Sequence, residues 1–263
     1  FNKLRTTDDL PEVIYAREYD AAISPNGNIP VHAFNLISPT FFANSSTGNK
    51  YSLWVNVYGV SERYLNVYGE KDLRAQMNQF FHRTYTHPVD GTTLDMKMLC
   101  NWYWYDETAI LETGKGTKDW NFYRYAETLL SAAEAIAQSS GVNAEAAGYL
   151  AQVKARANME GKDVSTIASE LQRLGKQAFI EECWKERLRE FPLEMKIWDD
   201  CVRTGKFPQI SATNKGEVQF VDLIGATNGS GAKFKETDLY WPIPVNEIQR
   251  NPNLTQNEGY SAK

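Results

Sequence analysis

The segment NFYRYAETLLSAAEAIAQ, residues 121–138, carries the clearest structural signal in this chain of 263 residues. Its apolar side chains recur at steps of three and four residues: Phe122, Tyr125, Ala126, Leu129, Leu130, Ala133 and Ile136. That spacing places them along one face of an α-helix. Ser139, Ser140 and Gly141 follow and predict its end. The segment therefore predicts an amphipathic helix whose apolar stripe needs a packing partner.

Two later stretches supply that partner. Asn143 is a good N-cap for a helix over residues 144–158. A third helical stretch begins near Ser165, is interrupted at Gly175 and continues over residues 176–191. Short connections favour antiparallel packing of successive helices, as in a helical-repeat pair, although no repeat recurs at a fixed period. We expect a shared core that includes Leu129, Leu130, Ala133, Leu150 and Val153.

The remainder of the chain is irregular. Turn clusters such as SPNGNIP (24–30) interrupt residues 1–120, and YSLWVNVYGV (51–60) has strand composition. DDLPEVIYAREYD (8–20) fits either a helix with Pro11 in its first turn or an extended segment. We expect one domain over residues 1–263, in three parts. These are 1–120, irregular with short strands and helices; 121–191, helical; and 192–263, a loop-rich closing segment.

Composition excludes several classes of function. Lys and Arg are scattered and the net charge is −5, so nucleic acid is not an expected partner. No apolar run is long enough to cross a bilayer. The three cysteines form no CxxC motif, and the three histidines lack the one-turn spacing of a helical metal pair. We expect no metal and no cofactor, and we interpret Cys100, Cys183 and Cys201 as buried small hydrophobic residues.

Three segments together resemble the SusD/RagB family of outer-membrane nutrient-binding lipoproteins. In residues 121–135 the resemblance is carried by Arg124, Ala126, Glu127, Leu130, Ala133, Glu134 and Ala135. In ERLREFPLEMKIWDDCVRTGKFP (186–208) it is carried by Glu186, Arg187, Glu190, Glu194, Trp198, Asp200, Arg203, Thr204 and Gly205. The third segment, LYWPIPVNEIQRNPNLTQNEGY (239–260), is similar to the family's closing motif, and EKDLRAQM (70–77) is a weaker fourth match.

The sequence departs from the family pattern at three positions. Met195 stands where the family usually has Gly, and Ile197 stands where it usually has Arg. Pro192 lies inside the second motif. These departures alter a local turn and one ion pair. The resemblance to the family stands. The resemblance covers most of this chain but only the C-terminal part of a typical member.

The resemblance implies a mainly α fold, with helical-repeat-type helices packed against a large loop-rich, irregular portion. It also implies a non-enzymatic role at the cell surface of a bacterium of the Bacteroidetes group. A family member captures a poly- or oligosaccharide and passes it to a TonB-dependent outer-membrane transporter of the SusC type. The lipid anchor of such a lipoprotein lies outside this chain. A peptide or glycoprotein ligand is the alternative within the family, and a glycoside hydrolase on a helical scaffold is the alternative from another class.

The stretch CNWYWYDE (100–107) is the most distinctive candidate for ligand binding, because four aromatic residues are consecutive. If it is extended, Trp102 and Trp104 share one face and Tyr103 and Tyr105 share the other. One pair then belongs to the core while the other lines a platform on which sugar rings stack. The competing interpretation places all four inside a domain junction. Trp54 and Tyr58 form a second, weaker candidate.

The acidic residues indicate structure rather than catalysis. Glu181-Glu182 and Asp199-Asp200 are adjacent pairs, and adjacent residues on a helix point in different directions. A glycosidase needs two carboxylates that face each other across a cleft. We therefore expect structural ion pairs and caps from one group of charged residues: Glu186, Arg187, Glu190, Asp200 and Arg203.

Overall fold

The computed structural model describes residues 10–20, 22–23, 60–87, 90–103, 105–106 and 118–261. The chain divides into two compact units. The first comprises Phe1–Met195 and Ile210–Glu217, and the second comprises Lys196–Gln209 and Val218–Lys263. The candidate functional site lies in the first unit.

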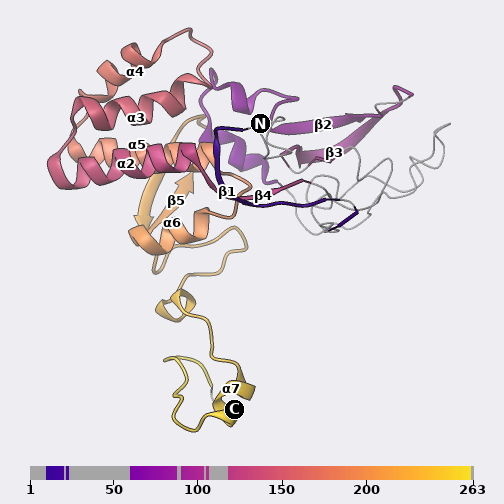
Figure 1. Ribbon diagram of the computed structural model, residues 1–263, viewed down its shortest axis with the longest axis vertical. Helices are drawn as coiled ribbons and strands as arrows, with labels where there is room; N and C mark the ends of the chain where they lie inside the picture. Colours follow the sequence, from indigo (N-terminus) through magenta and orange to yellow (C-terminus); the bar gives the residue numbers. More distant parts are fainter. Residues whose placement is uncertain are drawn as a thin grey trace. The chain divides into compact units, whose positions relative to one another are not determined.

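Four helices form the packed part of the first unit (Figure 1): α2 (Tyr125–Ser140), α3 (Ala144–Ala155), α4 (Val164–Leu171) and α5 (Lys176–Glu190). Helix α2 packs on α3 and α5, and α3 packs on α4. The predicted core is confirmed, since the five expected side chains are all buried: Leu129, Leu130, Ala133, Leu150 and Val153. The predicted ends are confirmed as well. Gly141 has a left-handed φ of 82° after α2, and the Asn143 side chain accepts a hydrogen bond from the Ala146 N–H.

The predicted start of the first helix is wrong by four residues. Residues Trp120–Arg124 form strand β4, which pairs antiparallel with β1 (Val13–Arg17). The Tyr125 N–H donates to the Glu12 carbonyl at 2.7 Å, so the helix begins only after this pairing ends. A partner more than 100 residues away thus overrides a helical periodicity that continues through Phe122. Of the two interpretations of residues 8–20, the extended one is confirmed at β1.

A hairpin and two short 3-10 helices complete the described part of this unit. Strand β2 (Phe81–Thr86) pairs antiparallel with β3 (Thr93–Asn101), with a register shift between His82 and Thr84. The 3-10 helices are η2 (Glu62–Val67) and η3 (Leu73–Ala75). The turn before β2 contains Asn78 at a left-handed φ of 66°, and its N–H donates to the Phe81 carbonyl at 2.9 Å. Asn tolerates this conformation better than most residues.

The second unit carries α6 (Ile197–Thr204), β5 (Lys206–Ile210), β6 (Val218–Asp222), η5 (Glu236–Leu239) and α7 (Val245–Arg250). Strand β5 pairs with β6. The closing segment is held by side chains that satisfy its irregular backbone. Gln256 bonds both the N–H and the carbonyl of Ile243 at 2.8 Å, and the Tyr260 hydroxyl donates to the Thr237 carbonyl at 2.9 Å.

Candidate functional site

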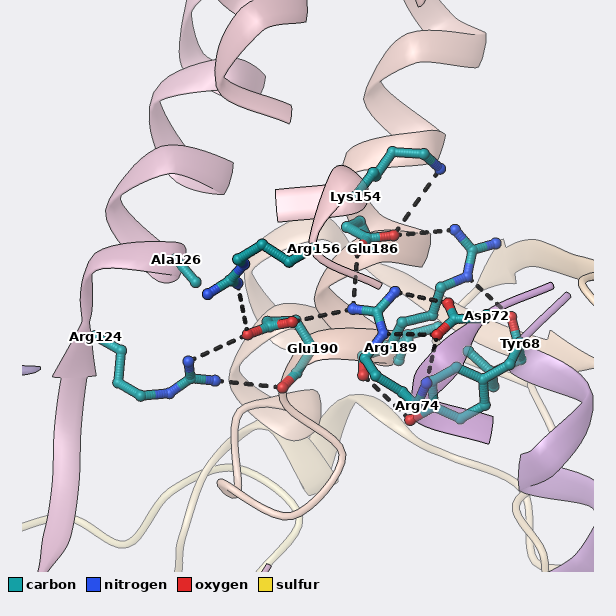
Figure 2. A network of polar contacts seen from close by, with 12 residues as sticks. Tyr68, Asp72, Arg74, Arg124, Ala126, Lys154, Arg156, Glu186, Arg189 and Glu190 are labelled. Carbon is teal, nitrogen blue, oxygen red and sulfur yellow. Dashed lines mark hydrogen bonds and ion pairs between the residues drawn. The ribbon is translucent and has the colours of Figure 1, made fainter. Parts of the chain in front are cut away.

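Charged residues of the motif segments meet in one buried network of the first unit (Figure 2). Arg74, from η3, is 4% exposed. It holds both carboxylate oxygens of Asp72, with Nη2 2.7 Å from Oδ2 and Nε 3.0 Å from Oδ1. Its Nη1 lies 2.9 Å from a Glu186 oxygen and 3.0 Å from a Glu190 oxygen, both from α5. One guanidinium therefore joins η3 to α5.

Arg124, the last residue of β4, is a second centre of the network. Its side chain is 1% exposed and holds Glu194 with two bonds, Nη2 to Oε1 at 2.6 Å and Nε to Oε2 at 2.8 Å. Its Nη1 bonds Glu12 at 2.8 Å and Glu190 at 3.1 Å. Glu190 thus connects Arg74 with Arg124, and the paired carboxylate geometry suits the planar fork of each guanidinium.

The electrostatics of this network favour a structural role. Burial opposes the charge on Glu186, yet Arg74, Lys154 and Arg189 hold the pKa of Glu186 below its ordinary value. Burial likewise opposes the charge on Arg74, but the carboxylates of Glu186, Asp72 and Glu190 hold the pKa of Arg74 well above its ordinary value. Both groups stay charged at neutral pH and neither serves as a proton donor there.

The expected ion pairs are confirmed throughout this set. Arg187 bonds Glu127 at 3.2 Å, and Arg203 bonds Asp200 at 3.2 Å within α6. Of the adjacent acidic residues, Glu182 pairs with Lys154 and Arg189, while Glu181 accepts from Gln177.

Three aromatic rings stack at the end of the β2–β3 hairpin. The His82 ring lies 3.9 Å from the Trp102 ring at an interplanar angle of 12°. The Tyr105 ring lies 5.0 Å from Trp102 at 18°. Tyr85 is tilted against both, at 5.9 and 6.4 Å. We call His82, Trp102 and Tyr105 the aromatic stack; all three are half-buried.

Backbone hydrogen bonds fix the stack. The Trp102 N–H donates to the Phe80 carbonyl at 2.7 Å, and the Tyr105 N–H donates to the Trp102 carbonyl at 3.1 Å. The chain therefore turns between Trp102 and Tyr105. Burial lowers the pKa of His82 to about 4, against a weaker opposing effect of its hydrogen bond to the Gln79 backbone. The stack is uncharged at neutral pH.

The predicted alternation of faces over residues 102–105 is wrong, because the turn brings Trp102 and Tyr105 to the same side. Tyr103 is 5% exposed and does not belong to an open platform. The Lys118 ammonium lies 4.3 Å from the Tyr103 ring centroid and donates to the Tyr103 carbonyl. The remaining candidates, Trp104, Trp54 and Tyr58, lie outside the described residues.

Sequence reasoning missed His82, which lies 20 residues before Trp102. A usable signal was present, since Asp90-Gly91 is a typical hairpin turn. A hairpin closed at that turn pairs the flanking strands, and the observed register places His82 opposite Cys100. Trp102 then follows two residues later.

The described residues hold neither a metal-binding cluster nor a reactive thiol. Within them, no group of three or more His, Cys, Asp or Glu side chains is arranged to hold a metal ion. All three cysteines are buried, as expected, and burial raises the pKa of Cys100 and Cys201 to about 11. Such thiols are poor nucleophiles and metal ligands. No helix in the same part of the chain has the length and apolar character to span a membrane.

Comparison with known proteins gives consistent results. The model of the SusD family matches residues 43–260. The starch-binding protein SusD of Bacteroides thetaiotaomicron is 36% identical over 138 residues, which cover 52% of this chain and 21% of that protein. Among solved structures, a SusD superfamily protein from Parabacteroides distasonis is 27% identical with a TM-score of 0.78, over 98% of this chain and 52% of that one.

A more distant structure is surface glycan-binding protein A from Bacteroides thetaiotaomicron, solved in complex with laminarihexaose. It is 21% identical with a TM-score of 0.56, over 94% of this chain and 52% of that one. Sequence identity at that level is evidence for a shared fold only. The chain spans about half the length of the solved relatives and about a fifth of the curated one. The predicted mainly α fold with a large irregular portion is confirmed by these likenesses.

Proposed function

The chain belongs to the SusD family, and from that premise we propose that it binds an oligosaccharide without cleaving it. The aromatic stack is the observation that supports this most directly. Its rings are half-buried and near-parallel, so they are held in place before a ligand arrives. Sugar rings have C–H faces that pack on such aromatic side chains. A preorganised surface binds with a lower ordering cost.

Of the predicted site residues that the structure describes, Trp102 and Tyr105 belong to the stack, and we propose these two as ligand contacts. Each keeps part of its side chain exposed, whereas Tyr103 is enclosed. Trp104 is adjacent in sequence and is proposed to extend the same surface, and Trp54 and Tyr58 remain proposed as further contacts. His82 supports Trp102 from the neighbouring strand. Because the stack is uncharged at neutral pH, it suits a neutral glycan.

The arrangement of carboxylates supports binding over hydrolysis. Four acidic residues of the motif segments are paired with arginines: Asp72, Glu186, Glu190 and Glu194. A glycosidase instead needs one carboxylate and one carboxylic acid facing a substrate. We therefore propose that the protein binds its ligand and is not an enzyme.

The proposal extends to location and partner. Proteins of Bacteroides and Parabacteroides are among the relatives. We place the full-length protein at the outer membrane, facing outward and lipid-anchored. There it passes its ligand to a TonB-dependent transporter of the SusC type. Co-purification with such a transporter from the native membrane tests this part of the proposal, and failure to co-purify under conditions that preserve other outer-membrane complexes contradicts it.

Isothermal titration calorimetry with maltoheptaose and laminarihexaose tests the binding function. Trp102→Ala and Tyr105→Ala should each cost about 1–3 kcal/mol, or roughly 5- to 150-fold in affinity. Trp241→Ala and Tyr240→Ala are matched controls, since those rings are 85% and 63% exposed in the closing segment. Affinity retained in both stack variants, with unchanged melting temperatures, contradicts the proposed site.

The two alternatives give different results in the same samples. Release of new reducing ends during incubation with the sugars identifies a hydrolase and overturns the binding proposal. Binding of a glycopeptide or peptide in place of every glycan tested also overturns it.

A further inference from the structure

A hollow of about 290 Å³ lies in the first unit. Its wall has an apolar part, from Leu73, Phe80 and Ala157, and a polar part, from Gln79 and Arg156. Arg74 and Glu190 of the buried network complete the lining. This volume is at the lower end of the range for small-molecule pockets. It suits a single sugar residue rather than a whole oligosaccharide.

The hollow and the aromatic stack share one short turn. Gln79 and Phe80 line the hollow, and the backbone of the same two residues holds the stack. The Phe80 carbonyl accepts the Trp102 N–H, and the His82 ring bonds the Gln79 backbone. Residues opposite each other in an antiparallel pair lie about 5 Å apart. One bound chain of a few sugar residues can therefore contact both places.

The left-handed turn that precedes β2 supports a fixed geometry between the two places. Asn78 has a φ of 66°, and the bridge between Met77 and Phe81 closes the turn around it. A residue in this region of φ and ψ persists only where the surrounding structure holds it. The turn therefore connects the hollow and the stack through a backbone of fixed conformation.

The charges around the hollow favour an uncharged ligand. Arg74 is already bonded by three carboxylates: Asp72, Glu186 and Glu190. Glu190 is in turn bonded by three guanidiniums: Arg74, Arg124 and Arg156. At Arg74 and Glu190, an incoming anion or cation would have to displace one of these pairs, at the cost of a buried charge left without its partner. A neutral ligand disturbs none of them.

Polar groups at the mouth of the hollow offer hydrogen bonds. The Arg156 side chain is 46% exposed, and its bonds to Glu190 at 3.0 Å and Glu12 at 3.4 Å use two of its five N–H donors. Gln79 is exposed and carries both a donor and an acceptor. Apolar side chains opposite a polar rim match the two sides of a sugar ring, its C–H face and its hydroxyl groups.

We propose that this hollow is a second subsite, which takes one uncharged sugar residue of an oligosaccharide held on the aromatic stack. This inference rests on the proposed function. It predicts that ligand length matters: a chain long enough to reach both places binds more tightly than one that covers the stack alone.

Calorimetry with the malto- and laminari- series, from disaccharide to hexasaccharide, tests the subsite. The variants are Ala157→Leu, which fills the hollow, and Arg156→Gln and Gln79→Ala, which remove donors at its mouth. Each should weaken hexasaccharide binding about tenfold, the equivalent of one or two hydrogen bonds. Disaccharide binding should change less than twofold. Matched controls on exposed positions are Ala144→Leu, Arg173→Gln and Gln172→Ala.

The outcomes separate this inference from the proposed function. If hexasaccharide affinity is unchanged in all three hollow variants while Trp102→Ala abolishes it, the subsite is wrong and the stack stands. If the hollow variants weaken binding and the stack variants do not, the hollow binds sugar by itself and the linked arrangement is wrong. Should Ala157→Leu lower the melting temperature, Arg156→Gln and Gln79→Ala still decide, because both side chains are at the surface.

Discussion

Replacing Arg124 by methionine probes the buried network at its most enclosed point. The guanidinium is 1% exposed and bonds carboxylates of three residues: Glu12, Glu190 and Glu194. Methionine fills a similar volume without charge, so the variant removes the cation and leaves the carboxylates of Glu190 and Glu194 buried. Breaking a buried ion pair in this way costs about 3–5 kcal/mol. For a unit of this size that corresponds to a melting temperature lower by about 6–20 °C.

Urea denaturation followed by far-UV circular dichroism measures the loss. The control is Arg250→Met, which breaks the exposed pair with Glu247, whose side chains are 76% and 52% exposed. Exposed pairs contribute about 0–1 kcal/mol, so this control should lie close to wild type. The double variant Arg124→Met/Glu194→Met should be more stable than Arg124→Met alone, because it removes the stranded carboxylate as well.

Two results would refute this reasoning. One is a loss below about 1 kcal/mol for Arg124→Met, which would mean that water or a rearranged side chain replaces the guanidinium easily. The other is a double variant as unstable as the sum of its two single changes. Additivity of that kind indicates two sites that do not interact, in conflict with the bidentate bonds of 2.6 and 2.8 Å.

Two further predictions concern the neighbourhood of α5. Met195 has a left-handed φ of 58° and is 61% exposed, so Met195→Gly should relieve strain and raise the urea midpoint, a net gain of about 0.5–1 kcal/mol, whereas Met195→Ala should give none. Burial opposes ionisation of Glu182, but Lys154 and Arg189 lower the pKa of Glu182 to about 2. Its folded-state pKa is thus below the unfolded one, so stability on the order of 3 kcal/mol is present above about pH 5 and is lost as the pH falls towards 2. In Glu182→Gln, the urea midpoint should depend less on pH between about pH 5 and 2 than it does in the wild type. An equal pH dependence in both proteins would contradict this prediction.

The helices were predictable because their signal is local. Apolar spacing, the Asn143 cap and Gly141 all act within one or two turns, and each is found where the sequence places it. The error at residues 121–124 has the opposite origin. Strand β4 exists because β1 offers a partner far along the chain, and no periodicity within the segment carries that information.

The charged residues show the same difference between local signals, which are predictable, and long-range pairing, which is not. Their residue types predicted ion pairs, and the structure confirms ion pairs. Which residue meets which was not predictable, since Arg74 reaches Glu190 over a separation of 116 residues. Met195 shows what a family pattern adds: the position usually held by Gly does adopt a left-handed φ, and this chain accommodates methionine there.

The aromatic cluster shows a different limit. Four consecutive aromatic residues led to the prediction of a binding surface in this segment, but an assumption of extended backbone assigned their faces wrongly. The Tyr105 N–H bond to the Trp102 carbonyl turns the chain, and His82 arrives from the other strand of the hairpin. A stack built from a turn and a cross-strand neighbour depends on register, and a shift by one residue reverses every face.

The buried network and the proposed subsite are connected through Arg74 and Glu190, which belong to both. A surface hollow lined by long flexible side chains would have to order them on binding, at about 0.5–1.5 kcal/mol for each. Here the two charged groups at its base are immobilised beforehand by carboxylates and guanidiniums on α5, β4 and η3. The ion pairs that stabilise the fold therefore also fix the wall against which a sugar residue would pack. Arg156 and Gln79 at the mouth keep N–H donors for its hydroxyl groups.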